Sequence, residues 1–500
     1  MMELVQNFPF ITIVFSLTCG VFCAVLRGKG AKRLCMLWLT AAFFMSAATL
    51  AYVLRTGEAY VYLMGRWPAP WGNEIRVGVL EALTATAFSG IMLLSLLGGM
   101  HHIFEDCDPE KVNLYFTMVS LLMSSLFALI YTNDLFTAYA FVEINTIASC
   151  ALVMLRNSVK TLVATTRYLV MSLLGSGLFL MGIVILYGIT GHLLMEPIGQ
   201  AVRTMAQTGE YAFPLTVIVG LFCVGLAVKS ALFPFHSWLP DAHGSATASS
   251  SSILSGLVLK GYIILLIKIF YRIFGLELLA HERAANFIFI FGVLAMLGGS
   301  LGALRERDLK RMLAYSSVAQ VGYIYVGIGL NTASGMLVAC IQILVHALTK
   351  PMLFCAAGGF MDVSGGHKDM DAITGAGRRD PLGGIAFTVG ALSMIGLPFF
   401  AGFVTKLHLT TASLASSSPR MLLTLAALVI STLLNALYYI PVIYNLYSHP
   451  HDGRYKYVRT HYRWEYVTAM VCFIVFNLIF GIFSEPIVNA VRSGLAMFGL

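Results

Sequence analysis

Long apolar segments follow one another through almost the whole of this 500-residue chain, separated by short polar connections. Many of them exceed the ~20 residues that an α-helix needs to cross the hydrocarbon core of a membrane. Lipid offers the backbone no hydrogen bonds, so segments of this kind fold as helices. Only 11% of the residues are charged, whereas soluble domains carry roughly 25%. The chain is therefore predicted to be an all-α polytopic membrane protein.

Fourteen transmembrane spans are predicted, and no connection between them is long or polar enough for a soluble domain. The first span is preceded only by Glu3 as a charge, so we expect a retained helix rather than a cleaved signal peptide. The predicted spans are 8–26, 34–54, 78–100, 113–131, 134–155, 163–190, 213–235, 246–274, 286–304, 311–330, 334–358, 383–416, 420–447 and 464–491.

The distribution of Lys and Arg between the connections predicts the orientation of the chain. Connections after odd-numbered spans carry 19 of these residues and the opposite side carries 9. Lys268, at the outer end of the eighth span, is counted on that opposite side as an interface anchor. Basic loops favour the cytoplasm, so both termini are predicted to lie outside, in the cell inner (cytoplasmic) membrane. The net charge of +8 then reflects topology, and no nucleic-acid partner is expected.

Single ionisable residues stand inside several apolar segments. A charge in hydrocarbon is costly, so membrane proteins keep such residues mostly along ion or proton pathways. Each one alone also admits a structural role, as a buried pair or as a side chain that extends to the interface. Together they predict an ion path. They are Glu143 in AYAFVEINTIASCALVML, Lys229 in LFCVGLAVKSALFPF, Lys260 in ILSGLVLKGYIILLI, His346 and Lys350 in CIQILVHALTKPMLF, and Lys406 after GLPFFAGFVT.

Two segments interrupt the helical pattern. Pro234 and Pro240 stand in VKSALFPFHSWLPDAHGSA, and Gly396, Pro398 and Gly402 stand in GALSMIGLPFFAGFVTKLHL. Proline removes a backbone donor and glycine eases bending, so each segment is expected to break its helix. Broken helices in corresponding positions of two halves are typical of inverted-repeat transporters. We predict three N-terminal helices in 1–109, a first repeat (helices 4–8) in 110–275, an inverted second repeat (helices 9–13) in 276–447, and a cytoplasmic loop with the final helix in 448–500.

The nine cysteines give no sign of a metal or cluster site. Most fall within spans and none form a C-x-x-C pair, so we expect small buried hydrophobes. Neither a phosphate-binding loop nor a dinucleotide-binding glycine motif occurs in a strand-to-helix context. The chain is accordingly expected to hold no nucleotide, flavin or metal cofactor.

Five stretches of the chain, in the family order, resemble the antiporter-like subunits of the complex I superfamily. They are FVEINTIASCALV, VKSALFPFHSWLPDAHGSATASSSSILSGLVLK, DLKRMLAYSSVAQVGYI, HALTKPMLF and GLPFFAGFVTK, within positions of about 110 to 410. That family includes proton-pumping membrane subunits of NADH:quinone oxidoreductase, large subunits of Mrp sodium/proton antiporters, and subunits of membrane-bound energy-converting NiFe hydrogenases. The number of predicted spans, fourteen, matches the number of helices in these subunits.

This resemblance implies a role in a proton relay for each buried ionisable residue. One departure is Val142, where many relatives have tryptophan, and it concerns only the packing of the glutamate. The matches are Glu143 to the fifth-helix glutamate, Lys229 to its partner lysine on the broken seventh helix, Lys260 to the central eighth-helix lysine, His346 and Lys350 to the eleventh-helix pair, and Lys406 to the terminal lysine on the broken twelfth helix.

The expected mechanism is a hydrated relay along the membrane plane. Burial favours neutral lysine, whereas a nearby carboxylate favours the charged form. An ion pair would therefore hold the proton of Lys229 beside Glu143, and opening it would release that proton toward Lys260. At ~4 Å and an effective dielectric constant of ~20, such a pair contributes about 4 kcal/mol. His346 and Lys350 share one helix face because they are four residues apart, and histidine titrates in a range suited to relaying protons.

Three functions compete for this sequence. The first is a proton- (or sodium-) translocating subunit of a redox-driven respiratory or hydrogenase-type complex. The alternative is a subunit of a multisubunit Mrp-type Na⁺/H⁺ antiporter. The third, a self-contained transporter or membrane scaffold without ion movement, is disfavoured because a scaffold has no need of several midplane lysines. Expected partners are other membrane subunits, including paralogous antiporter-like ones, and peripheral redox subunits, since no redox chemistry is expected in this chain itself.

Overall fold

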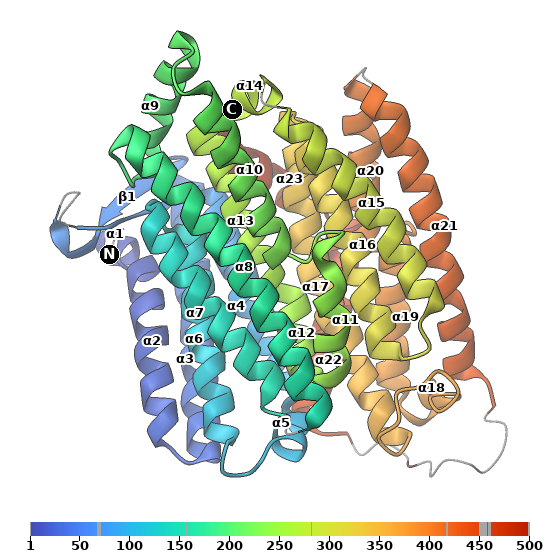
Figure 1. The fold of residues 1–500 in the computed structure, drawn as a ribbon. Helices are drawn as coiled ribbons and strands as arrows, with labels where there is room; N and C mark the ends of the chain where they lie inside the picture. Colours follow the sequence, from blue (N-terminus) through green and yellow to red (C-terminus); the bar gives the residue numbers. More distant parts are fainter. Residues whose placement is uncertain are drawn as a thin grey trace.

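The computed structural model describes residues 2–67, 72–156, 158–281, 283–416, 419–449, 458 and 462–498 of the chain. These residues form a bundle of long helices that lie side by side (Figure 1). A short β-hairpin and the C-terminal segment lie at the upper end of the bundle in this view, and α18 (Ala376–Arg379) lies at the lower end. The predicted helical membrane architecture is confirmed.

The elements follow the chain in four groups. The first group is α1 (Met2–Gln6), α2 (Phe8–Val25), α3 (Gly28–Thr56), β1 (Tyr60–Leu63), the 3₁₀ turn η1 (Met64–Arg66), β2 (Glu74–Val77), α4 (Val79–Gly98) and α5 (Met100–Asp106). The second is α6 (Val112–Tyr131), α7 (Leu135–Met154), α8 (Val159–Thr190), α9 (Met195–Thr208), α10 (Ala212–Lys229), the 3₁₀ turn η2 (Phe235–Ser237), α11 (Trp238–Ser245), α12 (Ala248–Ile253), the π-helical turn η3 (Leu254–Val258), α13 (Leu259–Ile269) and the π-helical turn η4 (Phe270–Phe274). The third is α14 (Gly275–His281), α15 (Ala284–Arg305), α16 (Leu309–Gly329), α17 (Ala333–Val363), α18, α19 (Pro381–Ile395), α20 (Ala401–Ala415) and α21 (Pro419–Tyr447), and the last is α22 (Trp464–Ile482) and α23 (Glu485–Ala496).

Twelve helical runs in the described part of the chain are long and apolar enough to cross a membrane. Every predicted span coincides with a helix or a group of helices. Two of them, on α16 and on the α19–α20 pair, fall outside the twelve, because α16 is less apolar and α19 and α20 are each short. The count of fourteen and the inverted relation of the two repeats stay predictions. The predicted loop at 448–463 lies mostly outside the described residues.

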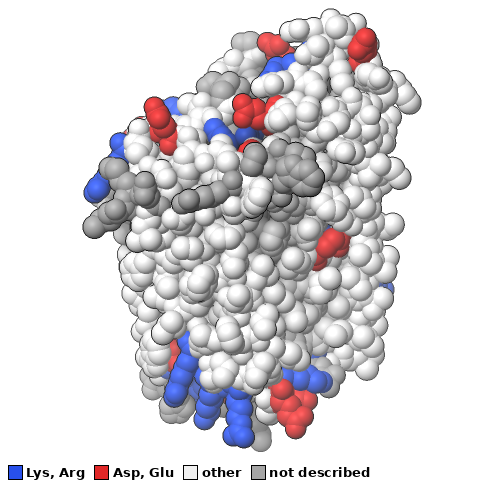
Figure 2. All heavy atoms as spheres, turned by 90° about the vertical axis from the view of Figure 1, so that its left-hand side faces the viewer, with Lys and Arg blue, Asp and Glu red and all other residues white. Residues whose placement is uncertain are grey.

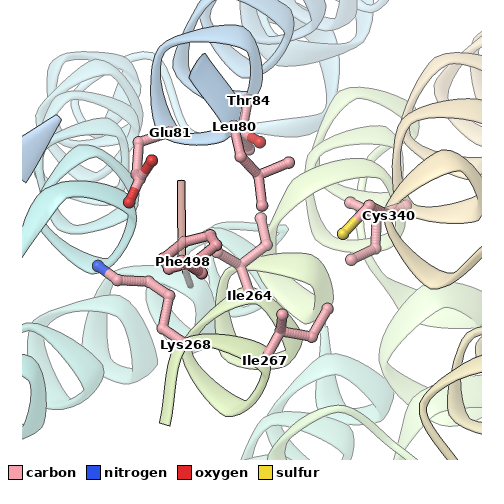
Figure 3. Close-up of a pocket in the computed structure, with 9 residues that line it drawn as sticks. Leu80, Glu81, Thr84, Ile264, Ile267, Lys268, Cys340 and Phe498 are labelled. Atoms are coloured by element: carbon pink, nitrogen blue, oxygen red, sulfur yellow. The ribbon is translucent and has the colours of Figure 1, made fainter. Parts of the chain in front are cut away.

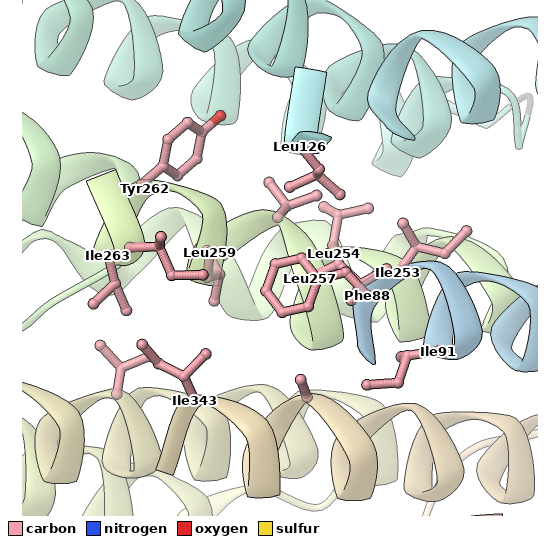
Figure 4. Packing of buried hydrophobic residues seen from close by; sticks show 14 of the residues in the cluster. Phe88, Ile91, Leu126, Ile253, Leu254, Leu257, Leu259, Tyr262, Ile263 and Ile343 are labelled. Atoms are coloured by element: carbon pink, nitrogen blue, oxygen red, sulfur yellow. The ribbon is translucent and has the colours of Figure 1, made fainter. Parts of the chain in front are cut away.

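Two helical runs occupy the centre of the bundle. The run Ala248–Leu279 and helix α17 have their most apolar windows wholly buried, whereas outer helices such as α3 and α22 have 28% of theirs buried. Figure 4 shows the apolar contacts that hold the central run in place: Phe88 and Ile91 of α4, Leu126 of α6 and Ile343 of α17 surround Ile253 to Ile263. Packing at crystal-like density fixes side chains in single positions. Residues on these two runs are therefore held away from lipid.

Both segments predicted to break a helix do so. α10 ends at Lys229, and residues 230–234 separate it from η2 and α11. α19 ends at Ile395, and α20 begins at Ala401. Non-helical backbone at membrane depth is tolerated where protein surrounds it or where it lines a wet cavity. The two breaks thus mark places where backbone carbonyls are free to bind other groups.

Charged side chains are unevenly spread over the surface. On the face that Figure 2 shows, Lys and Arg gather at the lower end beside a few acidic groups, charges of both signs lie at the upper end, and a broad belt between them has few charged atoms. The belt is the surface that lipid would cover, because exposed charge is costly in hydrocarbon.

Helix α5 docks on α17 through a buried histidine. A Cβ at Gly358 of α17 would lie 2.8 Å from His102 Cε1. His102 Nε2 is 2.9 Å from Asp362 Oδ1, one turn further along α17. Burial disfavours the charged ring and lowers the pKa of His102, and the positive charge of Lys310 acts in the same direction. The hydrogen bond to Asp362 and the negative charges of Asp362 and Asp106 outweigh them, so the pKa of His102 is raised.

The contact between His102 and Asp362 is expected to make stability depend on pH. Because the pKa of His102 is raised on folding, the contact stabilises the protein fully at pH values below the pKa of histidine in the unfolded chain, ~6.5. The stabilisation is lost as the pH rises through the pKa of His102 in the folded protein. Asp362→Asn is expected to lower the free energy of unfolding by about 1 kcal/mol near pH ~6 and by less near pH ~9. Thermal unfolding in detergent at both pH values measures this difference. Equal losses at both would contradict the assigned contact.

Candidate functional site

The six ionisable residues predicted from the sequence lie on five helices of the bundle. Four of them, Lys229, Lys260, His346 and Lys350, are at most 1% exposed. Glu143 and Lys406 are half-buried. Their elements are α7 for Glu143, α10 for Lys229, α13 for Lys260, α17 for His346 and Lys350, and α20 for Lys406.

Lys229 is the last residue of α10, directly before the first helix break. Its Nζ donates to Thr146 Oγ1 of α7 at 2.6 Å and to Ser172 Oγ of α8 at 3.1 Å. It also lies 5.3 Å from the centre of the Tyr262 ring. Gly175 leaves room for the lysine stem, since a Cβ there would lie 3.1 Å from Lys229 Cγ. The ammonium is thus held by neutral oxygens and a ring face, which is a cation–π contact.

Glu143 lies one turn before Thr146 on α7, on the face that turns toward Lys229. Within the described residues, no ion pair joins Glu143 to Lys229. Glu143 Oε1 is buried without a hydrogen-bond partner among these residues. In this structure Glu143 and Lys229 are therefore not paired. The lysine instead binds the hydroxyl of Thr146, one turn from Glu143, and the hydroxyl of Ser172 on α8.

Lys260 follows an irregular turn of the central run. A π-helical turn such as η3 forms i→i+5 bonds and often marks a functional site. The Lys260 ammonium donates to the carbonyl of Ser255 within this turn. Ser255 Oγ is 2.8 Å from Ser317 Oγ of α16. Gly256 lets the turn approach α17 closely, because a Cβ there would lie 2.5 Å from Pro351 Cγ.

His346 and Lys350 lie one turn apart on α17, as predicted from their spacing. Lys350 Nζ donates to the Leu313 carbonyl at 2.9 Å and to Tyr439 Oη at 3.4 Å. Neither ring nitrogen of His346 has a hydrogen-bond partner within the described part of the chain. A buried imidazole in this state can take or give a proton at either nitrogen without breaking a protein hydrogen bond.

A chain of buried hydroxyl and amide groups runs from Lys350 to Tyr323. Its members belong to α15, α16 and α21, and neighbouring polar atoms lie within hydrogen-bond distance. The steps are Lys350 Nζ to Tyr439 Oη (3.4 Å), Tyr439 Oη to Ser316 Oγ (2.8 Å), Ser316 Oγ to Tyr438 Oη (3.0 Å), Tyr438 Oη to Asn435 Oδ1 (2.7 Å), Asn435 Oδ1 to Ser300 Oγ (3.3 Å), Ser300 Oγ to Ser431 Oγ (3.2 Å), and Ser431 Oγ to Tyr323 Oη (3.1 Å).

Lys406 lies at the far end of this polar chain. Its Nζ is 5.6 Å from the centre of the Tyr323 ring and donates to Thr432 Oγ1 at 2.7 Å. It also donates to the carbonyl of Ile395, the last residue of α19. The helix break leaves that carbonyl without a helical N–H partner. Gly396, with φ of +89°, is needed beside it, because a Cβ there would lie 2.5 Å from Lys406 Cδ.

The sequence analysis found the ionisable residues but missed their neutral partners. Thr146 and Ser172 hold Lys229, and Tyr438, Tyr439 and Asn435 connect Lys350 with the Lys406 end. The available signal was polar residues inside apolar spans, spaced so that they share one helix face. Such residues are common in membrane helices as packing contacts, so the sequence alone did not distinguish these from the rest.

Buried lysines, two broken helices and a polar chain from Lys350 to the second break define a polytopic membrane protein with ionisable groups in its core. Residues 132–434 match the family described as NADH:quinone oxidoreductase/Mrp antiporter, TM. The chain is 33% identical over 412 residues to NADH-quinone oxidoreductase subunit N of Desulforudis audaxviator. The matched region covers 80% of this chain and 78% of that protein. The chain belongs to this family.

A second relative agrees with that assignment, and a solved structure has a similar fold. The chain is 30% identical over 355 residues to an Na(+)/H(+) antiporter subunit of Alkalihalophilus pseudofirmus, with 70% of this chain and 69% of that protein covered. Its fold is similar to a chain in the structure of the Mrp complex from Dietzia sp. DQ12-45-1b, with a TM-score of 0.86 and 23% identity. That match covers 99% of this chain and 97% of the other.

Proposed function

We propose that this chain is the ion-translocating membrane subunit of a multisubunit, redox-driven complex. It moves protons along the axis Glu143, Lys229, Lys260, His346, Lys350 and Lys406 in the plane of the membrane. The observation that carries the proposal is that oxygens of hydroxyls and backbone carbonyls hold all four lysines. A lysine held in this way can lose its proton without leaving an unpaired carboxylate behind, which would be costly in a buried site.

Lysine and histidine suit this task for chemical reasons. Burial readily changes the proton occupancy of lysine, whereas arginine stays charged, and no arginine is among the six residues. His346 lies between Lys260 and Lys350 in the proposed order. Its two ring nitrogens, which have no hydrogen-bond partner among the residues that the structure describes, can pass a proton on. The polar chain from Lys350 to Tyr323 then supplies hydrogen-bonded stepping points toward Lys406.

The pair formed by Glu143 and Lys229 is the proposed switch. In the open arrangement, Lys229 binds Thr146 and Ser172. Closure of the pair to ~4 Å would favour the charged lysine by about 4 kcal/mol at an effective dielectric constant of ~20. That energy changes the proton affinity of the lysine by roughly a thousandfold. Opening and closing at the first broken helix would therefore load and discharge the axis.

The four-part organisation predicted from the sequence is retained in this proposal. Residues 1–109 form an N-terminal group of helices, 110–275 and 276–447 the two repeats, and 448–500 the last loop and helix. Both termini face outside and the basic loops face the cytoplasm of a bacterial inner membrane. The gathering of Lys and Arg at the lower end of the bundle supports this orientation.

A second function is favoured by a specific observation. The 30% identity to a subunit of an Na(+)/H(+) antiporter supports membership of a gradient-driven Mrp-type antiporter, in which sodium also moves. In both functions the partners are other membrane subunits, including paralogous antiporter-like ones. Peripheral redox subunits belong to the first function only.

Gentle extraction from the native membrane followed by mass spectrometry separates the two functions. Co-purified subunits with iron–sulfur, NiFe or flavin sites would support the redox-driven complex. Co-purification of small membrane subunits and paralogues alone would overturn the redox assignment and favour the antiporter. Proton and sodium uptake by vesicles containing the purified complex then identifies the transported ion.

The hydroxyl of Tyr439 is expected to matter for translocation. Tyr439→Phe removes one acceptor of Lys350 and interrupts the polar chain at its first step. Loss of a hydrogen bond worth about 1 kcal/mol is expected to slow proton translocation roughly fivefold. Tyr444→Phe, a change at a 77% exposed residue of the same helix, is the matched control. Equal rates for the two variants in energised vesicles would remove the chain from the proton path.

A further inference from the structure

A small cavity lies beside the upper part of α13, outside the axis described above. Residues of α4, α13 and α17 line it, together with Phe498, which follows α23 (Figure 3). It offers about 20 Å³ to the centre of a water molecule, which is room for about one water. Most of the lining is apolar. The two ionisable residues that reach it are Glu81 and Lys268.

Glu81 has one carboxylate oxygen that is in an ion pair but accepts no hydrogen bond within the described part of the chain. The residue is 3% exposed, and its Oε2 accepts the backbone N–H of Gly78 at the start of α4 at 3.1 Å. Oε1 lies 3.6 Å from Arg76 Nη1 and has no hydrogen-bond partner among the described residues. A buried carboxylate oxygen that accepts no hydrogen bond is uncommon, even beside an ion-pair partner, and indicates a functional contact or a bound water.

The sequence analysis expected Lys268 to anchor its helix at the membrane interface, but in the structure this lysine is buried. It is 1% exposed, because the C-terminal end of α6 covers it. Its ammonium donates to the carbonyls of Ile130 at 2.7 Å and Thr132 at 2.5 Å. Figure 3 shows the Lys268 ammonium and the Glu81 carboxylate directed toward the same side of the cavity. The prediction was wrong because hydropathy gives the depth of a residue but not what packs over it.

The cavity continues the helix faces that carry the central relay residues. Lys260, Ile264 and Lys268 are spaced by four residues on α13, so they share one face. Ile343 lies three residues before His346 on α17, again on a shared face. Both isoleucines line the cavity. Lys268 lies eight residues from Lys260, or roughly 12 Å along the helix, so one apolar layer separates the relay from the cavity.

On its other side, the cavity is covered by the segment after α23. The Phe498 ring centre is 5.3 Å from the Arg76 guanidinium and 6.2 Å from the ring of Tyr271. Arg76 also donates to the carbonyl of Met497. The covering segment is thus attached through the arginine that contacts Glu81. A movement of this segment would uncover the cavity and loosen the contact to Glu81 together.

We propose that Glu81 and Lys268 form a proton-release site, separated from the central relay by the Ile264–Ile343 layer and covered by Phe498. The inference rests on the proposed function, because it needs protons to reach Lys260 and His346. It adds an outlet beside the centre of the axis, toward the end of the bundle opposite the basic loops.

The proposed transfer involves only one proton and no other change. A proton leaves the Lys260 ammonium, passes a transient water in the Ile264–Ile343 layer, and binds Glu81 Oε1. Lys260 becomes neutral and is recharged by the relay. Glu81 then returns to its carboxylate form as the proton leaves past Phe498. The guanidinium groups of Arg76 and Arg272, which interact electrostatically with Lys268, oppose the entry of cations from that side.

The test compares substitutions at Glu81 in the intact complex, assayed in inside-out membrane vesicles. Glu81→Gln keeps an oxygen for the Gly78 N–H but takes no proton, and is expected to lower the translocation rate at least about tenfold. Glu81→Asp keeps the acid and is expected to restore a substantial part of the rate. Glu210→Gln, at an exposed residue at the same end of the bundle, is the control and should match the unmodified protein.

A second variant keeps the proposal testable if Glu81→Gln fails to assemble. Phe498→Ala is expected to speed the decay of the proton gradient severalfold after the driving reaction is stopped, because it opens the outer cover. An unchanged decay would overturn the proposal, as would equal losses for Glu81→Gln and Glu81→Asp or a normal rate for Glu81→Gln. Lys229→Ala distinguishes the proposed function from the proposed release site. If Lys229→Ala is inactive and Glu81→Gln has a normal rate, the release site is disproved and the proposed function stands.

Discussion

Lys229→Ala is expected to abolish ion translocation while leaving the protein assembled in the membrane. The ammonium makes two hydrogen bonds to hydroxyls of α7 and α8 at the end of a broken helix. Removing it takes away the group that, in the proposed mechanism, releases a proton when its pair with Glu143 opens. Loss of a positioned proton carrier is expected to slow translocation on the order of a hundredfold or more. Fluorescence quenching by a pH-sensitive dye in energised vesicles measures the rate.

Two further substitutions show whether the proton or the charge of Lys229 matters. Lys229→Arg keeps the positive charge but does not release a proton near neutral pH, so it should also be inactive. Lys160→Ala removes an exposed lysine from α8 and should leave the rate unchanged. An active Lys229→Arg variant would assign this position a fixed structural charge, and a normal Lys229→Ala variant would overturn the relay.

Lys406→Met is expected to have the second large effect. Methionine fills most of the space of the lysine stem but provides no ammonium for Thr432, Tyr323 or the free carbonyl of Ile395. The polar chain then ends at a tyrosine ring without an acceptor for the proton. We expect translocation to fall on the order of a hundredfold, with normal amounts of assembled complex.

The surroundings of Lys406 offer a graded comparison. Thr432→Val removes one of the groups that bind the ammonium and is expected to slow translocation roughly fivefold, as the loss of about 1 kcal/mol implies. Lys29→Met, at an exposed position of α3, is the control. A Lys406→Met variant that translocates at the normal rate would place the end of the proton path at Lys350.

The sequence was sufficient to predict the membrane fold, because span length and hydropathy are local properties. It also identified Lys229 and Lys406, since a charge inside an apolar segment is visible without knowing its neighbours. Both helix breaks were predicted for a similar reason, as proline and glycine act on the backbone where they stand. Each of these features depends on a stretch no longer than one helix.

The features that escaped prediction depend on which helix faces meet. Glu81 looks like an ordinary first-turn acid that caps α4, and only packing of the Phe498 segment over it reveals a closed cavity. Lys268 has the position of an interface anchor, yet α6 covers it. The His102–Asp362 contact joins residues 260 positions apart. Helix rotation and neighbour choice decide all three, and they result from the packing of the whole bundle.

Two of the buried lysines bind backbone oxygens at irregular places in the helices: Lys260 binds Ser255 in a π-helical turn, and Lys406 binds Ile395 at a helix break. A carbonyl is not titrated at any physiological pH, so acid and base cannot alter these partners. The proton affinity of such a lysine changes when its carbonyl moves. A small displacement of either irregular segment would therefore be converted into uptake or loss of a proton, and a proton gained or lost would push that segment in return. If these lysines carry protons as proposed, the helix irregularities are where mechanical work and proton binding would be exchanged.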